Sequence, residues 1–106
     1  MQQTALEDAL EHAMFVRDEK QSAQAAARWL DELEAVILSL AEMPNRYKMI
    51  DERESFRITL RQVLHHSHRV VFHVNEGTQT VHVLRVYHGS RRALSPEDVP
   101  TPDRGQ

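Results

Sequence analysis

The sequence of 106 residues contains no cysteine, only three glycines and no long apolar run. Without cysteine the chain has no disulfide, no thiolate zinc site and no cysteine nucleophile, and this favours a cytoplasmic location. Three glycines are too few for a Gly-rich phosphate-binding loop. No apolar run approaches the 18 residues of a transmembrane helix, so no membrane association is expected. Acidic residues at Glu7, Asp8 and Glu11 argue against a secretory signal.

Charge is distributed unevenly along this chain, whose formal net charge is −3. Residues 1–54 contain 6 basic and 12 acidic side chains, whereas residues 55–106 contain 7 basic and 4 acidic ones. Every basic residue of the second half is an arginine. Arginine suits contacts with phosphate and other anions, although a solvated surface with an arginine bias explains the same pattern.

Two amphipathic helices are predicted in the first half of the chain. The first covers residues 4–20, where Thr4 followed by Glu7 has the form of a capping box. The second covers residues 22–42, with Ser22 as N-cap and Pro44 beyond its end. The apolar stripe is Leu6, Ala9, Leu10, Ala13 and Met14 in the first helix, and Ala26, Trp29, Leu30, Leu33, Val36, Ile37 and Leu40 in the second. The short break between them predicts an antiparallel helical hairpin.

Three β-strands are predicted in the second half, over residues 56–62, 69–74 and 80–87. Short connections between them predict an antiparallel meander. The fold class is therefore α+β, with the helical hairpin packed on one face of a three-stranded antiparallel sheet and the other face left open. Residues 4–94 form the single predicted domain. Residues 95–106 contain three prolines and are predicted to be disordered.

The histidines suggest a metal site at first sight, because His65, His66 and His68 cluster between two strands. Adjacent residues of an extended segment point to opposite sides, so the cluster is interpreted as a polar loop, and neither a metal nor another cofactor is predicted. A turn that pairs Val74 with Gln79 would place Val71 opposite His82 and His73 opposite Thr80. Arg69, His73 and His82 would then share the open face of the sheet.

The third strand ends in a concentration of polar groups, Tyr87-His88-Gly89-Ser90-Arg91-Arg92. Such a set can cut RNA: a base takes the proton of the 2′-hydroxyl that attacks the phosphate, an acid protonates the leaving oxygen, and arginine stabilises the extra charge. A polar strand end that simply faces water is the alternative. Partner docking and core packing are both open for the apolar residues Leu38, Met43, Tyr47 and Met49.

Three segments in this order resemble the RelE/ParE superfamily of bacterial toxins from type II toxin–antitoxin systems, also called plasmid stabilisation proteins. Residues 26–44 resemble the family's second helix and its Leu-x-x-x-Pro ending. Residues 68–74, His-Arg-Val-Val-Phe-His-Val, resemble a Tyr-Arg-hydrophobic-hydrophobic-Tyr-x-Val strand, and residues 83–92 resemble the closing strand with its His-Gly-x-Arg signature. The long hairpin and the Val-Tyr-His-Gly-Ser-Arg-Arg ending look closer to the ParE-like branch.

The resemblance implies a growth-inhibiting toxin that is neutralised by a cognate antitoxin. ParE-like members inhibit DNA gyrase, whereas RelE-like members are endoribonucleases that cut messenger RNA on the ribosome, so whether the chain is an enzyme stays open. The candidate catalytic residues it implies are Arg69, Tyr87, His88 and Arg91. The candidate residues for binding nucleic acid or another target are Arg57, Arg61, His73, His82, Arg85 and Arg92. A homodimer and a toxin–antitoxin hetero-oligomer are both compatible with the family.

Two departures from the family separate the hypotheses. The sequence predicts no counterpart of the family's first strand, because Met1-Gln2-Gln3 leads directly into the first helix, and an unpaired sheet edge is therefore expected. A net charge of −3 is unfavourable for binding ribosomal RNA. Gyrase inhibition is the first hypothesis, a ribosome-dependent endonuclease the second, and an inactive remnant that only binds antitoxin the third.

Overall fold

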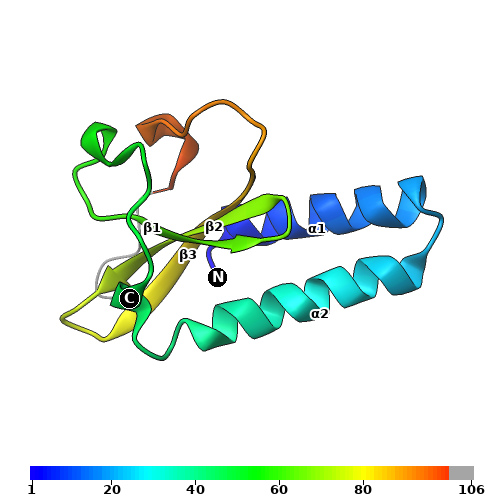
Figure 1. Cartoon of the computed structure of the whole chain (residues 1–106), viewed down its shortest axis with the longest axis horizontal. Helices are drawn as coiled ribbons and strands as arrows, with labels where there is room; N and C mark the ends of the chain where they lie inside the picture. The colour runs from blue at the N-terminus through cyan, green and yellow to red at the C-terminus, as the bar shows by residue number, and fades with distance from the viewer. Residues whose placement is uncertain (101–106) are drawn as a thin grey trace.

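The computed structural model describes residues 1–100 of the chain. Helix α1 (Gln3–Glu19) and helix α2 (Ala23–Ser39) form an antiparallel hairpin (Figure 1). Strands β1 (Arg61–His65), β2 (His68–Asn75) and β3 (Thr80–His88) form an antiparallel sheet in the order β1-β2-β3. Short 3-10 turns, η1 (Pro44–Arg46), η2 (Arg53–Ser55) and η3 (Pro96–Asp98), lie in the connecting segments. The predicted α+β class and the meander are confirmed.

The two helix starts differ from each other in how they are capped. Ser22 caps α2 as predicted, because its Oγ accepts a hydrogen bond of 3.0 Å from the Ala25 backbone N–H. The capping box predicted from Thr4 and Glu7 is wrong, since α1 begins at Gln3 and no side chain caps it. Glu7 instead accepts a hydrogen bond of 3.2 Å from the Gln3 side chain.

Helix α1 buries a row of small side chains rather than its large apolar ones. Ala5, Ala9, Ala13 and Val16 face the interior, because small residues let the helix lie close to α2 and the sheet. The predicted stripe is therefore partly wrong. The exposed part, which we call the α1 apolar row, consists of Leu6, Leu10 and Met14, with 39%, 46% and 54% of their surface accessible.

Both faces of the sheet are covered, so the open polar face predicted from the sequence is wrong. The helices cover one face, whereas the segment before β1 and the segment after β3 cover the other (Figure 1). The core under the helices consists of Ala5, Ala9, Trp29, Leu33, Leu40, Val70, Phe72, Val83 and Val86. The core on the opposite face, which we call the second core, consists of Ile50, Leu60, Val71, Leu84, Tyr87 and Leu94.

The first strand lies later in the sequence than predicted. Leu60 belongs to the second core, and its carbonyl accepts a hydrogen bond from the Ile50 backbone N–H, so this segment pairs with residues 48–50 instead of extending β1. Strand β1 continues to His65, and the turn to β2 is only two residues long. His66 in that turn has a φ of 54°, in the left-handed region.

The register of β2 and β3 also differs from the predicted one. Asn75 pairs with Thr80 and His73 with His82, so the predicted pairing of Val74 with Gln79 is wrong. A β-bulge leaves Leu84 without a partner between the pairs of Phe72 with Val83 and Val71 with Arg85. The extra residue reverses the alternation of side chains along β3, and Val83 and Val86 consequently both contact the helices.

The outer edge of β3, where an unpaired edge was expected, is held by the start of the chain at two points. The Gln2 backbone N–H donates to the Val83 carbonyl at 2.9 Å. One carboxylate oxygen of Asp8 accepts from the Val86 N–H at 3.0 Å, and the same carboxylate binds the Arg85 guanidinium at 2.6 and 2.9 Å. Helix α1 therefore lies along the edge and satisfies part of it.

A half-buried ion pair attaches the segments of the second core to the sheet. Glu52, before β1, accepts two hydrogen bonds of 2.8 Å from Arg69 on β2 and a third of 2.9 Å from the Leu94 backbone N–H. Arg69 also donates through Nε to Gln62. Only 13% of the Glu52 side chain and 14% of the Arg69 side chain are accessible.

Contacts with the rest of the fold continue beyond residue 94, the predicted end of the domain. Asp98 closes the turn η3 by accepting from the Ser95 backbone N–H, and it binds the Arg92 guanidinium at 2.7 and 2.8 Å. Val99 packs against the second core. The rest of the predicted tail, residues 101–106, lies outside the described residues. Within residues 1–100, no helix is long and apolar enough to cross a membrane.

Replacing Glu52 by Gln is expected to destabilise the protein by about 2–3 kcal/mol at pH 7, because it leaves the Arg69 charge half-buried without its counter-ion. Arg69 lowers the pKa of Glu52 from 4.5 to about 2. The folded state therefore binds the proton more weakly than the unfolded state, and the stability advantage of the wild type is present above pH 4.5 and shrinks as the pH falls towards 2.

Urea unfolding of wild type and Glu52→Gln between pH 7 and pH 2 measures this difference. Glu54→Gln is the matched control, since Glu54 is exposed in the same turn and its replacement is expected to change stability by less than about 0.5 kcal/mol. An effect of Glu52→Gln no larger than that of the control, or one independent of pH, would contradict the role of the pair.

Candidate functional site

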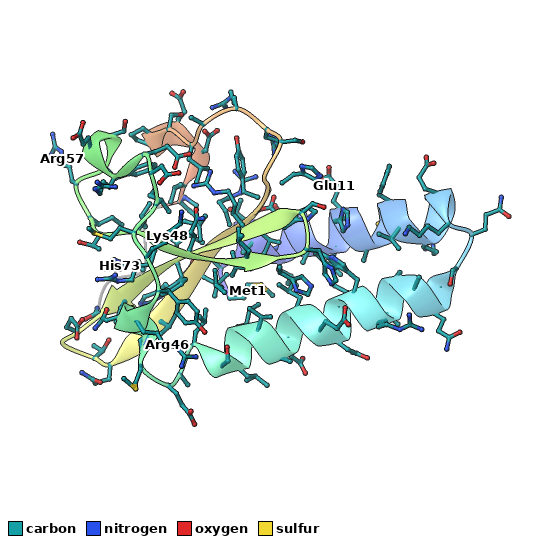
Figure 2. All side chains as sticks on the ribbon, in the orientation of Figure 1. Met1, Glu11, Arg46, Lys48, Arg57 and His73 are labelled. Carbon is teal, nitrogen blue, oxygen red and sulfur yellow. The ribbon has the colours of Figure 1, made fainter. Side chains whose placement is uncertain are left out.

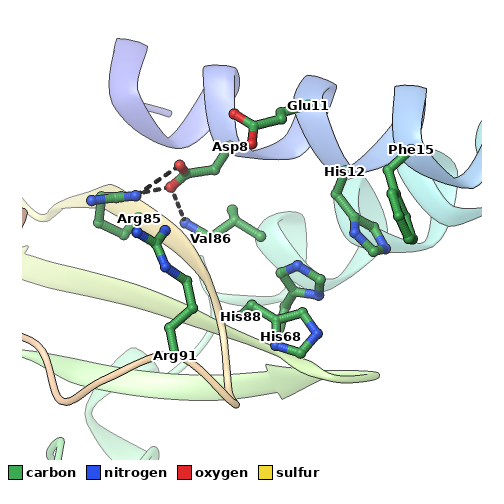
Figure 3. A pocket seen from close by; sticks show the side chains of 9 residues that line it. All are labelled: Asp8, Glu11, His12, Phe15, His68, Arg85, Val86, His88 and Arg91. Atoms are coloured by element: carbon green, nitrogen blue, oxygen red, sulfur yellow. Dashed lines mark hydrogen bonds and ion pairs between the residues drawn. The ribbon is translucent and has the colours of Figure 1, made fainter.

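The candidate site is a cavity of about 560 Å³ between α1 and the end of the sheet where β2 begins and β3 ends (Figure 3). Helix α1 supplies side chains one turn apart, and they face residues from β2, from β3 and from the segment after β3. The lining residues are Asp8, Glu11, His12, Phe15, His68, Arg85, Val86, His88 and Arg91.

Some of the charged groups in this cavity are already paired with each other. Asp8 and Arg85 form the bidentate ion pair described above, so neither charge is available to a ligand. The Arg91 guanidinium lies 4.7 Å from the centre of the Tyr87 ring, a cation–π contact that leaves its N–H groups exposed. The groups that remain for an incoming partner are Glu11, His12, His88 and Arg91.

Two hydrogen bonds fix the orientation of His88 in the cavity. Its Nδ1 accepts from the Ser90 backbone N–H at 3.1 Å and from the Ser90 hydroxyl at 2.7 Å. The proton of a neutral His88 therefore resides on Nε2. Gly89 follows, and its N–H donates to the Ser67 carbonyl at 2.7 Å; a Cβ at this position would lie only 3.0 Å from that oxygen. The glycine of the His-Gly-x-Arg signature thus permits a close backbone contact.

Three imidazoles pack edge to face in the site. The ring of His68 lies 4.2 Å from that of His12 and 4.8 Å from that of His88, measured between centroids. Only 4% of His68 is accessible, and its Nδ1 has no hydrogen-bond partner among the described residues. Burial, reinforced by the neighbouring imidazoles, lowers the pKa of His68 from 6.5 to about 4, so this ring is neutral at pH 7.

The four candidate catalytic residues do not lie together in one site. His88 and Arg91 meet in the cavity. Arg69 faces the opposite side of the sheet, where it binds Glu52. Tyr87 is only 1% accessible in the second core, and its hydroxyl donates to the Arg92 carbonyl. Neither Arg69 nor Tyr87 is therefore placed to contact a phosphate in the cavity with His88.

The candidate binding residues are spread over the molecule, and most have partners within the chain. Arg61 donates to the Tyr47 carbonyl, and His73, which lines a small cavity of about 260 Å³ with it, donates to the Thr59 carbonyl. His82 accepts from the Gln2 side chain. Arg85 and Arg92 are in the ion pairs described above, whereas Arg57 points away from the body of the protein (Figure 2).

The residues that α1 contributes to the cavity are not among the candidates predicted from the sequence. Asp8, His12 and Phe15 are spaced by four and three residues, the signature of one helical face. That spacing was visible in the sequence. The face it would meet was not, because the position of α1 along β3 depends on the contacts of Gln2 and Asp8 with the strand.

A second, more apolar groove of about 360 Å³ lies where the end of α2 meets the first half of β3. It contains Leu38, which is 68% accessible, beside Ile37 and Val81. The other residues of the predicted docking strip divide. Met43 and Met49 are exposed, whereas Tyr47 is half-buried and packs edge-on against Phe72. We call this surface the α2–β3 groove; its lining is Met1, Ile37, Leu38, Ala41, Pro44, Val74, Gln79, Thr80, Val81 and Val83.

Comparison with known proteins connects this architecture to a family. No curated protein matches the chain. The family model for the ParE toxin of the type II toxin–antitoxin system, parDE, matches residues 1–93, which include the helical hairpin, the whole sheet and the cavity. The match covers most of the chain and agrees with the resemblance drawn from the sequence. The chain therefore belongs to the ParE toxin family of type II toxin–antitoxin systems.

Proposed function

We propose that this toxin inhibits bacterial growth by binding DNA gyrase in the cytoplasm, and that a cognate antitoxin neutralises it. The observation that carries the proposal is the family match over residues 1–93. The α1 apolar row gives it a physical basis, because three large apolar side chains one turn apart on an exposed helix favour contact with a protein surface. We assign this row to the gyrase contact.

The state of the arginines supports protein contact over RNA cleavage. Binding to RNA phosphates needs accessible guanidinium groups, and a net charge of −3 works against it. The guanidiniums of Arg69, Arg85 and Arg92 are each bound by a carboxylate of the same chain. To contact a phosphate, each would have to leave that ion pair.

The antitoxin is assigned to the α2–β3 groove. Val83 presents its carbonyl to the outer edge of β3, where Gln2 binds it, and by the two-residue period of a strand Val81 presents its backbone groups to the same edge. The edge at Val81 is thus available for an added strand, and the exposed Leu38 provides an apolar contact next to it. A disordered antitoxin segment that folds on binding fits this combination.

A supercoiling assay with purified gyrase tests the proposed target. The wild-type protein is expected to inhibit supercoiling, and Leu10→Glu is expected to weaken inhibition about tenfold or more, because it puts a charge in the middle of the α1 apolar row. Leu64→Glu is the control, since Leu64 is also exposed, at 64%, but lies on β1. Unchanged supercoiling at a large excess of wild-type protein would refute gyrase as the target.

A ribosome-dependent endonuclease remains the second candidate, on the strength of one observation. His12, His88 and Arg91 meet in the cavity, and two imidazoles with a guanidinium have the chemistry for acid–base cleavage of RNA. This hypothesis requires that the wild-type protein cleaves messenger RNA on ribosomes. It also requires that His88→Gln and Arg91→Ala each abolish the cleavage. A chain that affects neither gyrase nor messenger RNA would be the third case, an inactive protein that only binds antitoxin.

The antitoxin assignment predicts a different pair of effects. The product of the neighbouring open reading frame is expected to co-purify with the wild-type chain. Leu38→Glu is expected to weaken that complex about tenfold or more, measured by calorimetry, because an apolar contact of the groove is replaced by a charge. Leu64→Glu again serves as the control. Equal affinities of the two variants would show that the antitoxin binds elsewhere.

A further inference from the structure

The turn between β1 and β2 brings together two histidines whose side chains an extended segment would separate. In an extended segment the side chains of His65 and His66 would point to opposite sides. His66 instead has the left-handed backbone conformation, with a φ of 54°, and the two ring centroids lie only 4.5 Å apart. A tight turn has thus converted an alternating pair into a convergent one.

A carboxylate from helix α2 completes the group. Glu32 lies one turn beyond Trp29, and its Oε1 accepts a hydrogen bond of 3.1 Å from Nε2 of His66. One ligand atom from each of Glu32, His65 and His66 lies within 4.8 Å of the other two. This carboxylate is more than 30 residues away in the sequence, which is why no spacing motif reveals the group.

His65 is buried and held by a backbone hydrogen bond, as metal-binding histidines commonly are. It is only 5% accessible, and its Nε2–H donates to the Trp29 carbonyl at 3.3 Å. This bond places the proton on Nε2 and leaves Nδ1 unprotonated, which is the form in which imidazole binds a metal.

We propose that Glu32, His65 and His66 form a binding site for a zinc ion that connects α2 to the β1–β2 turn. Two imidazoles and a carboxylate are a ligand set that Zn²⁺ accepts, with water in the fourth position. Ligand atoms around tetrahedral zinc lie about 3.4 Å apart, so modest rotation of two side chains closes the site. Those of Glu32 and His66 have this freedom, since 49% and 57% of their surfaces are accessible.

The site is separate from the assigned toxin surfaces. Neither the α1 apolar row nor the α2–β3 groove includes any of its residues. Zinc that binds only the folded state stabilises it by mass action, and the bound ion would hold the helical hairpin against the sheet. The role that follows is to strengthen the fold, and it does not depend on gyrase being the target.

Calorimetric titration of the full, tag-free chain with Zn²⁺ tests the site. We expect one ion per chain with a Kd below about 100 µM, and a rise in Tm of about 4 °C or more at saturation. Glu32→Gln and His66→Asn are each expected to weaken binding about tenfold or more. Asparagine tolerates the left-handed conformation, so His66→Asn keeps the turn while removing the imidazole.

Glu34→Gln is the matched control, because Glu34 is exposed on the same helix and outside the group. It should bind zinc as the wild type does. Shifts of the imidazole resonances of His65 and His66 on adding zinc, measured by NMR, would support the assignment directly. Absence of binding to the wild type would overturn the proposal. So would binding that survives in both Glu32→Gln and His66→Asn, since the ion would then be held by other histidines.

Discussion

The covering of the second face of the sheet depends on the ion pair between Glu52 and Arg69. It joins β2 to the segment before β1 and, through the Leu94 backbone, to the segment after β3. These segments complete the second core and cover the sheet face that a helical hairpin alone would leave open. Arg69, a candidate catalytic residue of the nuclease hypothesis, is therefore committed to holding two layers together. Surfaces for partners are left to the helices and to the end of the sheet.

Helix α1 has a corresponding role at the other edge. Asp8 binds Arg85 and the backbone of Val86, so the helix lies along β3 in a position fixed by both charge and backbone hydrogen bonding. That position creates the cavity around His12 and His88, and it turns the α1 apolar row outwards. The same contacts thus separate an apolar surface suited to a protein partner from a polar cavity.

The sequence was sufficient for the order and type of the elements, because hydrophobic periods of 3.6 and 2 residues are local properties. It was insufficient where contacts between residues distant in the sequence set the direction or pairing of a side chain. The bulge at Leu84 reverses the alternation in β3, and the turn at His66 reverses it between two adjacent histidines. The carboxylates Asp8, Glu32 and Glu52 engage residues far along the chain. The sequence was enough to name candidate residues. It did not show which of their charges are paired within the chain.

We propose that this ParE-family protein stops growth through a protein target of DNA metabolism. The most direct test is to induce the chain alone in a bacterial host and to follow labelled thymidine and labelled amino-acid incorporation side by side. We predict that thymidine incorporation falls first while protein synthesis continues. An earlier stop of amino-acid incorporation would contradict the claim and favour the cavity around His88 and Arg91 as a nuclease site.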